Sequence, residues 1–374
     1  MNERERYLET MLFGRPDRIP FSPGGARKST RETWHRQGLP EGVDYRAYLR
    51  ELLGIEPLPD IERIRPRVDF RMIPQFEEEV LEERESTLVV RDWKGNVCEI
   101  SNQYDVTYLR NAIDFVTRTW IKCPVETHDD WQDMKRRYCV DDPARFEEGF
   151  AARAAAVRDR RHVIVYSFPG PFWQLREWCG FENLCMLFLD DPDFVREMVD
   201  FWRDFLLAVL ERVYAHFVPD EIYFNEDMAY KEKAMISPAM CRQFLMPCWT
   251  QWSQQVRQAG TRVVDMDSDG FIGELIPLWI ESGINVCDPI EVAAGCDINA
   301  FRRDFGQKMG YVGGVDKRCI AKGGQVIRDE LARIEPVVRD GGYLPGCDHG
   351  VPSDISYPDF IEYSKGIARM TGWL

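Results

Sequence analysis

Carboxylates follow five successive short apolar segments in the second half of the chain, and the last segment is also followed by a thiol and an imidazole. The five groups occupy residues 225–227, 265–270, 287–291, 313–316 and 345–350. The carboxyl ends of parallel strands meet at one edge of a sheet, where the reacting groups of α/β barrels are found. The pattern therefore predicts an acidic active site at one rim of a parallel sheet.

Asp267 and Asp269 are two residues apart, so in extended backbone they point to the same side. Two such carboxylates can bind a divalent metal, or they can share a proton so that one of them has a raised pKa suited to acid–base catalysis. Asp269 could alternatively cap a helix that begins near Phe271. Glu226 and Asp227 follow another apolar segment, where they could do chemistry or tie neighbouring loops together.

Cys347 and His349 are also two residues apart. Cysteine and histidine together can bind zinc, and a thiolate is stabilised beside a metal or an imidazolium. The commoner role of a lone cysteine is that of a small buried apolar side chain. Both interpretations stay open from the residues alone.

An aromatic, proline-rich stretch occupies residues 167–173. Phe168, Phe172 and Trp173 in it could form an apolar wall for a ring-shaped substrate, or the loop could simply pack over the sheet. We add Tyr166, just before this stretch, and Asp316, after a later apolar segment, to the predicted substrate-binding residues.

Short apolar segments alternate with amphipathic helical stretches along most of the chain, which predicts a parallel sheet with helical crossovers. No GxGxxG motif follows a strand, so the pattern favours a (β/α)8 TIM barrel over a dinucleotide-binding sheet. Residues 76–101 instead predict an antiparallel hairpin or meander, with a turn at Lys94–Gly95, inserted between early strands of a single domain covering residues 1–374. The eight predicted strands are 18–22, 68–71, 163–167, 221–225, 262–267, 284–287, 309–313 and 342–345.

The composition excludes several classes of protein. A net charge of −15 argues against nucleic-acid binding, which depends on neutralising phosphates. No apolar stretch reaches the roughly 20 residues that span a membrane, and residues 1–20 are too charged for a signal peptide. The cysteines number eleven and form no CxxC pair, so we expect reduced thiols in a cytoplasmic protein.

Several motifs in this order resemble the uroporphyrinogen decarboxylase superfamily. They are FPGPFW, EDMAYKEKAMISP, DSDG, CDPIEVAAGCDI, GYVGGVD and GYLPGCDHGVPSDIS. The resemblance covers most of the chain, is strongest from Tyr166 onward, and implies a (β/α)8 barrel with its site at the carboxyl ends of the strands. It also implies one of two chemistries, decarboxylation of a tetrapyrrole or zinc-dependent methyl transfer involving a corrinoid protein. Homodimers are common among its members.

The chain departs from both branches. The decarboxylases carry an RQAGRY-type segment, where this chain reads PFSPGGARKSTRETW. The methyltransferases bind zinc through His-x-Cys and a later Cys, and the corresponding positions here are Asp267, Asp269 and Cys347. Because carboxylates are harder ligands than thiolates, such a site would bind zinc or another divalent metal as a Lewis acid.

The resemblance therefore predicts a corrinoid-linked methyltransferase of the O-demethylase type. It would move a methyl group from a methoxylated or methylated small molecule to a corrinoid carried by a partner protein. The metal held by Asp267, Asp269 and Cys347 would polarise the leaving group, and Glu226, Asp227 or His349 would handle protons. The alternative is a metal-free decarboxylase acting on a different carboxylated substrate, and a non-catalytic binding barrel is a third interpretation.

Overall fold

The computed structural model describes residues 1–111 and 117–374. They form two compact units. Unit 1 consists of residues 1–65, 155–168 and 217–374, and unit 2 of residues 66–154 and 169–216. Each unit is built from segments far apart in the sequence, so the units are not successive domains along the chain.

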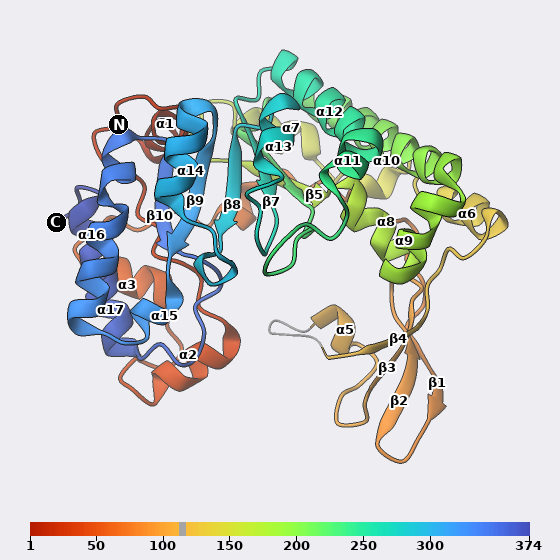
Figure 1. Cartoon of the computed structure of the whole chain (residues 1–374), viewed down its shortest axis with the longest axis horizontal. Coiled ribbons are helices and arrows are strands. Elements are labelled where there is room, and N and C mark those ends of the chain that lie inside the picture. Colours follow the sequence, from red (N-terminus) through yellow and green to blue (C-terminus); the bar gives the residue numbers. More distant parts are fainter. Residues whose placement is uncertain (112–116) are drawn as a thin grey trace. The chain divides into compact units, whose positions relative to one another are not determined.

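Unit 1 contains a six-stranded parallel sheet with the strand order β10-β9-β8-β7-β6-β5 (Figure 1). Its strands coincide with the last six predicted from the sequence, which confirms the α/β class. Consecutive strands are neighbours, as expected when each is followed by a crossover. The strands are β5(Val165–Pro169), β6(Glu221–Asn225), β7(Val263–Asp267), β8(Val286–Ile290), β9(Gly310–Val315) and β10(Tyr343–Cys347).

Helices separate these strands, and local signals explain where they begin. Ser356 caps α17 through its side chain, with Pro358 in the first turn, and α16 packs against β9 and β10. The helices of unit 1 are α1(Glu3–Met11), α2(Lys28–His35), α3(Tyr45–Leu52), α4(Ile61–Ile64), α11(Pro238–Met240), α12(Met246–Gln258), α13(Ile276–Glu281), α14(Ile298–Phe305), α15(Lys317–Ile320), α16(Gly324–Asp340) and α17(Tyr357–Met370), with a π-helical turn η2(Cys241–Leu245) before α12.

The first two predicted strands are absent from the described structure. Residues 18–22 form no strand, because Pro20 lacks an N–H and Ile19 bonds instead to Thr371 and Trp373. A single hydrogen bond joins Cys347 N to Pro23 O. Residues 68–71 belong to unit 2 and make only one antiparallel bridge, between Val68 and Phe146. Closure of the sheet into the predicted eight-stranded barrel is thus not confirmed.

The period of two along β6 and β7 gives the sheet two different faces. Phe224 on β6 packs against Trp252 of α12, with ring centroids 4.9 Å apart. The residues alternating with it face the other way, and there β6 carries Glu221, Tyr223 and Asn225. On the same face β7 carries Asp265 and Asp267, which are the register partners of Tyr223 and Asn225. Polar side chains therefore line one face where an apolar core is usual.

Unit 2 combines an antiparallel sheet with helices. The sheet has the order β1-β2-β3-β4, and the predicted hairpin is confirmed, with Gly95 in the turn between β2 and β3 at φ +92°. Trp131, Trp178 and Trp202 pack in its core. Its elements are β1(Glu79–Glu83), β2(Thr87–Arg91), β3(Val97–Ser101), β4(Thr119–Lys122), α5(Tyr108–Asn111), α6(His128–Lys135), α7(Phe150–Ala156), α8(Pro171–Cys179), α9(Phe181–Asp190) and α10(Pro192–Tyr214).

Across residues 1–111 and 117–374, no helix combines the length and the apolar character needed to cross a membrane.

Candidate functional site

A cavity of about 400 Å³ opens in unit 1 at the carboxyl ends of β6 to β10. Most of the ionisable residues predicted from the sequence lie in its wall, together with two that were not predicted. The lining consists of Gly24, Gly25, Tyr223, Asp227, Asp267, Asp269, Asp288, Pro289, Val312, Gly313, Cys347, His349 and Gly350. The predicted site at this edge of the sheet is therefore assembled in space.

Asp267 and Asp288 form the acidic centre of the cavity, because they are register partners on β7 and β8. Withdrawal from bulk water and the neighbouring Asp288 and Asp227 carboxylates raise the pKa of Asp267 to about 8, against the effect of a hydrogen bond from Asn225 Nδ2 to Asp267 Oδ2 (2.6 Å). Burial likewise raises the pKa of Asp288 to about 7, although its hydrogen bond with Tyr223 lowers it. These carboxyl groups are suited to holding a proton near neutral pH.

Two further carboxyl groups lie deeper in the sheet and form a row with Asp267 and Asp288. Asp265 and Glu221 are almost fully buried, at 2% and 4% exposure, and burial raises the pKa of both. Glu221 accepts a hydrogen bond from the Tyr7 hydroxyl. Within the described residues, none of Glu221, Asp265, Asp267 and Asp288 forms an ion pair, so no cation offsets the cost of burying these carboxyl groups.

His349 connects the acidic wall to a cation. Its Nε2 lies 3.2 Å from Asp269 Oδ2 and its Nδ1 lies 3.1 Å from Arg27 Nη2. A neutral imidazole with its proton on Nε2 donates to Asp269 and accepts from Arg27, which satisfies both contacts. The hydrogen bond with Asp269 raises the pKa of His349, while burial opposes this rise. The imidazole can therefore exchange a proton at the cavity wall.

The loops after β6 and β7 are bonded tightly together around Asp227. Its Oδ1 accepts a hydrogen bond from Asp269 N (3.0 Å), and its backbone is left-handed, at φ +39°. Gly270, at φ +89°, approaches the same loop so closely that a Cβ there would lie 2.5 Å from Ala229 O. A non-glycine residue held in this conformation is uncommon and is often part of a functional site.

Glu226, predicted as catalytic, does not line the cavity. It is completely buried and accepts a hydrogen bond from Trp249 Nε1 at 2.7 Å. Its neighbour Asp227 points to the cavity because successive side chains leave the backbone in different directions. The geometry thus favours a structural role for Glu226.

The three predicted metal ligands, Asp267, Asp269 and Cys347, all line the cavity. Burial raises the pKa of Cys347 to about 12, which keeps its thiol protonated, and the two carboxylates are engaged by Asn225 and His349. In the described part of the chain, no group of three or more His, Cys, Asp or Glu side chains is arranged to hold a metal ion. The donor set as arranged does not fit a metal, and zinc stays a prediction.

The predicted substrate-binding residues lie elsewhere than in the cavity wall. Phe168 packs against Phe224 and Trp252, on the apolar side of the sheet, and Tyr166 is two residues before it on the same strand. Asp316 caps α15 and binds Arg318, with Nη2 2.8 Å from Oδ2. Phe172 and Trp173 belong to α8 of unit 2.

Tyr223 and Asp288 are the ionisable residues of the cavity wall that reasoning from the sequence missed. Asp288 belongs to residues 287–291, one of the five segments that carry carboxylates. Tyr223 could have been found from the period of two, since it shares a face of β6 with Asn225.

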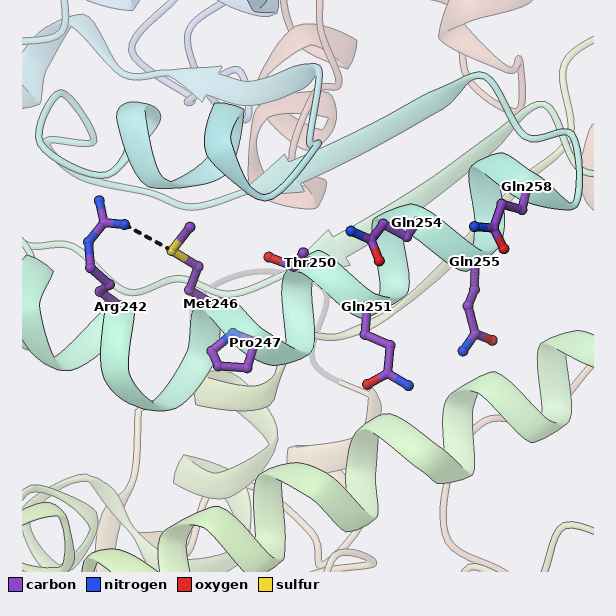
Figure 2. A pocket seen from close by; sticks show the side chains of 8 residues that line it. All are labelled: Arg242, Met246, Pro247, Thr250, Gln251, Gln254, Gln255 and Gln258. Carbon is purple, nitrogen blue, oxygen red and sulfur yellow. Dashed lines mark hydrogen bonds between the residues drawn. The ribbon is translucent and has the colours of Figure 1, made fainter.

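A second hollow, of about 640 Å³, lies along one face of η2 and α12 (Figure 2). Glutamines and Thr250 form most of its wall. Among the described residues of its lining, the ionisable one is Arg242, which is paired with Glu281 at 2.8 Å. It therefore lacks the acid–base groups found at the strand ends.

Comparison with solved structures supports the fold. A methyltransferase from Methanosarcina mazei superposes with a TM-score of 0.56 at 12% identity, covering 99% of each chain. A B12-independent methionine synthase from Shewanella sp. W3-18-1 gives a TM-score of 0.41 at 13% identity, covering 87% of this chain and 84% of its own. No protein-family model and no curated protein sequence matches. The predicted resemblance is thus confirmed at the level of the fold.

Proposed function

We propose that this chain is a methyltransferase that removes a methyl group from an oxygen atom of a methoxylated or methylated small molecule, with a carboxylic acid of the cavity protonating the oxygen as it leaves. The observation that carries this proposal is the Asp267–Asp288 pair. These two carboxyl groups share the cavity wall, lack an ion pair among the described residues, and have pKa values raised to about 8 and about 7.

The proposed step needs a proton donor at the leaving oxygen. The bond between the methyl carbon and that oxygen breaks, both electrons remain on the oxygen, and the proton of Asp267 moves to it. An electron pair of the acceptor forms the new bond to the methyl carbon. General acid catalysis of this kind contributes typically 10²–10⁴-fold, and a neutral carboxylic acid at pH 7 is suited to it.

The other cavity residues would support this acid. Asn225 donates to Asp267 Oδ2 at 2.6 Å, which leaves the other oxygen to carry the proton towards the substrate. Tyr223 orients Asp288. His349, between Asp269 and Arg27, would return a proton to the site after each turnover.

The predicted acceptor is a corrinoid carried by a partner protein, which would supply the nucleophile for the methyl group. A zinc ion also remains a prediction, and element analysis of the purified protein tests it separately from the acid.

The direct test is methyl transfer to free cob(I)alamin from a panel of methoxylated aromatic compounds. We expect Asp267→Asn to lower kcat by about 10²-fold or more, because the amide keeps the shape but cannot donate an acidic proton. Asp193→Asn, a matched change at a side chain that is 91% exposed, should leave kcat unchanged. Full activity of Asp267→Asn would contradict the proposal.

A decarboxylase is the second candidate, and Arg27 favours it. Its guanidinium reaches the cavity residue His349 at 3.1 Å and could receive a substrate carboxylate, while Asp267 could protonate the carbon that loses carbon dioxide. Release of carbon dioxide from a carboxylated substrate without any methyl acceptor would favour this candidate over methyl transfer.

A further inference from the structure

Lys317 does not line the cavity and is the first residue of α15, separated from the end of β9 by Asp316 alone. Its Nζ is 3.0 Å from Glu291 Oε1 and 3.8 Å from Asp348 Oδ1. Asp348 is completely buried and Glu291 is partly buried. A single cation thus stands between two carboxylates that belong to different loops.

Each of these carboxylates also accepts a hydrogen bond from a backbone N–H group of another loop. Asp348 accepts hydrogen bonds from Val292 N at 3.0 Å and from Lys317 N at 3.2 Å. Glu291 Oε2 accepts one from Gly270 N at 3.1 Å. Lys317, Glu291 and Asp348 therefore join the loops that follow β7, β8, β9 and β10.

Two residues of this network are sequence neighbours of Asp269 and His349, the hydrogen-bonded pair in the cavity wall. Gly270 directly follows Asp269, and Asp348 directly precedes His349. Displacement of either residue would lengthen the contact of 3.2 Å between His349 Nε2 and Asp269 Oδ2. The geometry of that pair thus depends on a residue that does not line the cavity.

We infer that Lys317 is a positioning residue, which acts through Asp348 and Glu291 to hold His349 against Asp269. The inference rests on the proposed function for its effect on catalysis. A buried carboxylate that loses its cation is strongly destabilised, so Asp348 would bind a proton or move towards water. Either change would weaken its hydrogen bonds with Val292 N and Lys317 N and shift the adjoining His349. Small misplacements of this kind can cost about 10²-fold in rate.

The test compares Lys317→Met with Lys317→Arg, which keeps the cation, and with Lys322→Met, which changes an exposed lysine nearby. We expect Lys317→Met to lower kcat about tenfold to a hundredfold with little change in KM. Lys317→Arg should recover most of the activity, and Lys322→Met should behave as the wild type.

Crystal structures of the wild type and of Lys317→Met give a second readout, which does not need activity. Loss of positioning should lengthen the distance of 3.2 Å between His349 Nε2 and Asp269 Oδ2 beyond the range of a hydrogen bond. An unchanged distance would show that Lys317 does not position the imidazole.

An unchanged contact between His349 and Asp269 in Lys317→Met would overturn the inference, and so would an unchanged kcat. If the wild type transfers no methyl group, the proposed function fails, but the two crystal structures still decide the role of Lys317. Should Lys317→Met not fold, Glu291→Gln weakens the same network without leaving Asp348 unpaired, and the same lengthened contact is expected of it.

Discussion

Asp220 and Glu221 are neighbours at the start of β6 and are equally buried, at 3% and 4% exposure, yet their surroundings are opposite. Asp220 lies between two guanidinium groups, 2.6 Å from Arg4 Nε and 2.7 Å from Arg160 Nη2. Glu221 faces the Tyr7 hydroxyl and Asp265, and burial raises its pKa to about 7.

The contrast shows two ways of stabilising a buried carboxyl group. One pairs the carboxylate with cations, which fixes structure. The other leaves it without a cation, so that it binds a proton near neutral pH. Asp265, Asp267 and Asp288 follow the second way, and their row leads from Glu221 to the cavity. Burial without cations therefore distinguishes the candidate site from the structural ion pairs.

The largest expected effect comes from removing a cation from the paired carboxylate. Arg160→Met would leave Asp220 buried with a single arginine that is 37% exposed, and breaking a buried pair costs about 3–5 kcal/mol. Unfolding in urea measures this loss. Arg303→Met, which removes an arginine with 71% exposure, is the control and should change stability little. Equal effects of the two changes would contradict the contrast.

Among the described residues, the row of Glu221, Asp265, Asp267 and Asp288 has no cation beside it. It therefore predicts that stability depends on pH with the opposite sign to that of ordinary carboxylates. The folded state raises the pKa values of Glu221 and Asp288 to about 7 and that of Asp267 to about 8. Their contribution to stability is complete below pH 4 and is lost as the pH rises through 7 to 8. We expect these groups to lower Tm as the pH rises from about 4 to about 8 and to cause no further fall above that.

The variant Glu221→Gln tests whether Glu221 contributes to this fall of Tm with pH. The amide cannot ionise, so the variant should lose less Tm than the wild type over the same pH range. Identical slopes in the two proteins would show that Glu221 holds no proton in the folded state.

A smaller effect is expected from Tyr7→Phe, which removes the donor to Glu221 and leaves the packing of the ring. A single hydrogen bond contributes about 1 kcal/mol, and the loss should be greatest above pH 7, where the ionised Glu221 needs the donor most. Urea unfolding at pH 6 and pH 9 measures both values. A loss that does not grow with pH would indicate that Glu221 stays neutral throughout.

The sequence patterns predicted which residues lie at the edge of the sheet better than they predicted the roles of those residues. Spacing by two placed Asp267 with Asp269 and Cys347 with His349, and all four line the cavity, because strand ends impose the period locally. The roles of Glu226 and Phe168 depend on which neighbouring elements pack against them. Such contacts join residues far apart in the chain, so local patterns could not reveal them.

The contrast between paired and unpaired carboxylates applies only where burial removes water, and Asp17 tests that limit. Arg6 lies 2.8 Å away and lowers the pKa of Asp17 strongly, but the Asp17 side chain is 40% exposed. Its contribution is present above pH 4 and is lost as the pH falls through the lowered value. Water and salt screen such a pair, so Asp17→Asn should cost less than about 1 kcal/mol at pH 7. A loss as large as that of Arg160→Met in urea unfolding would show that pairing alone, without burial, determines the stabilisation.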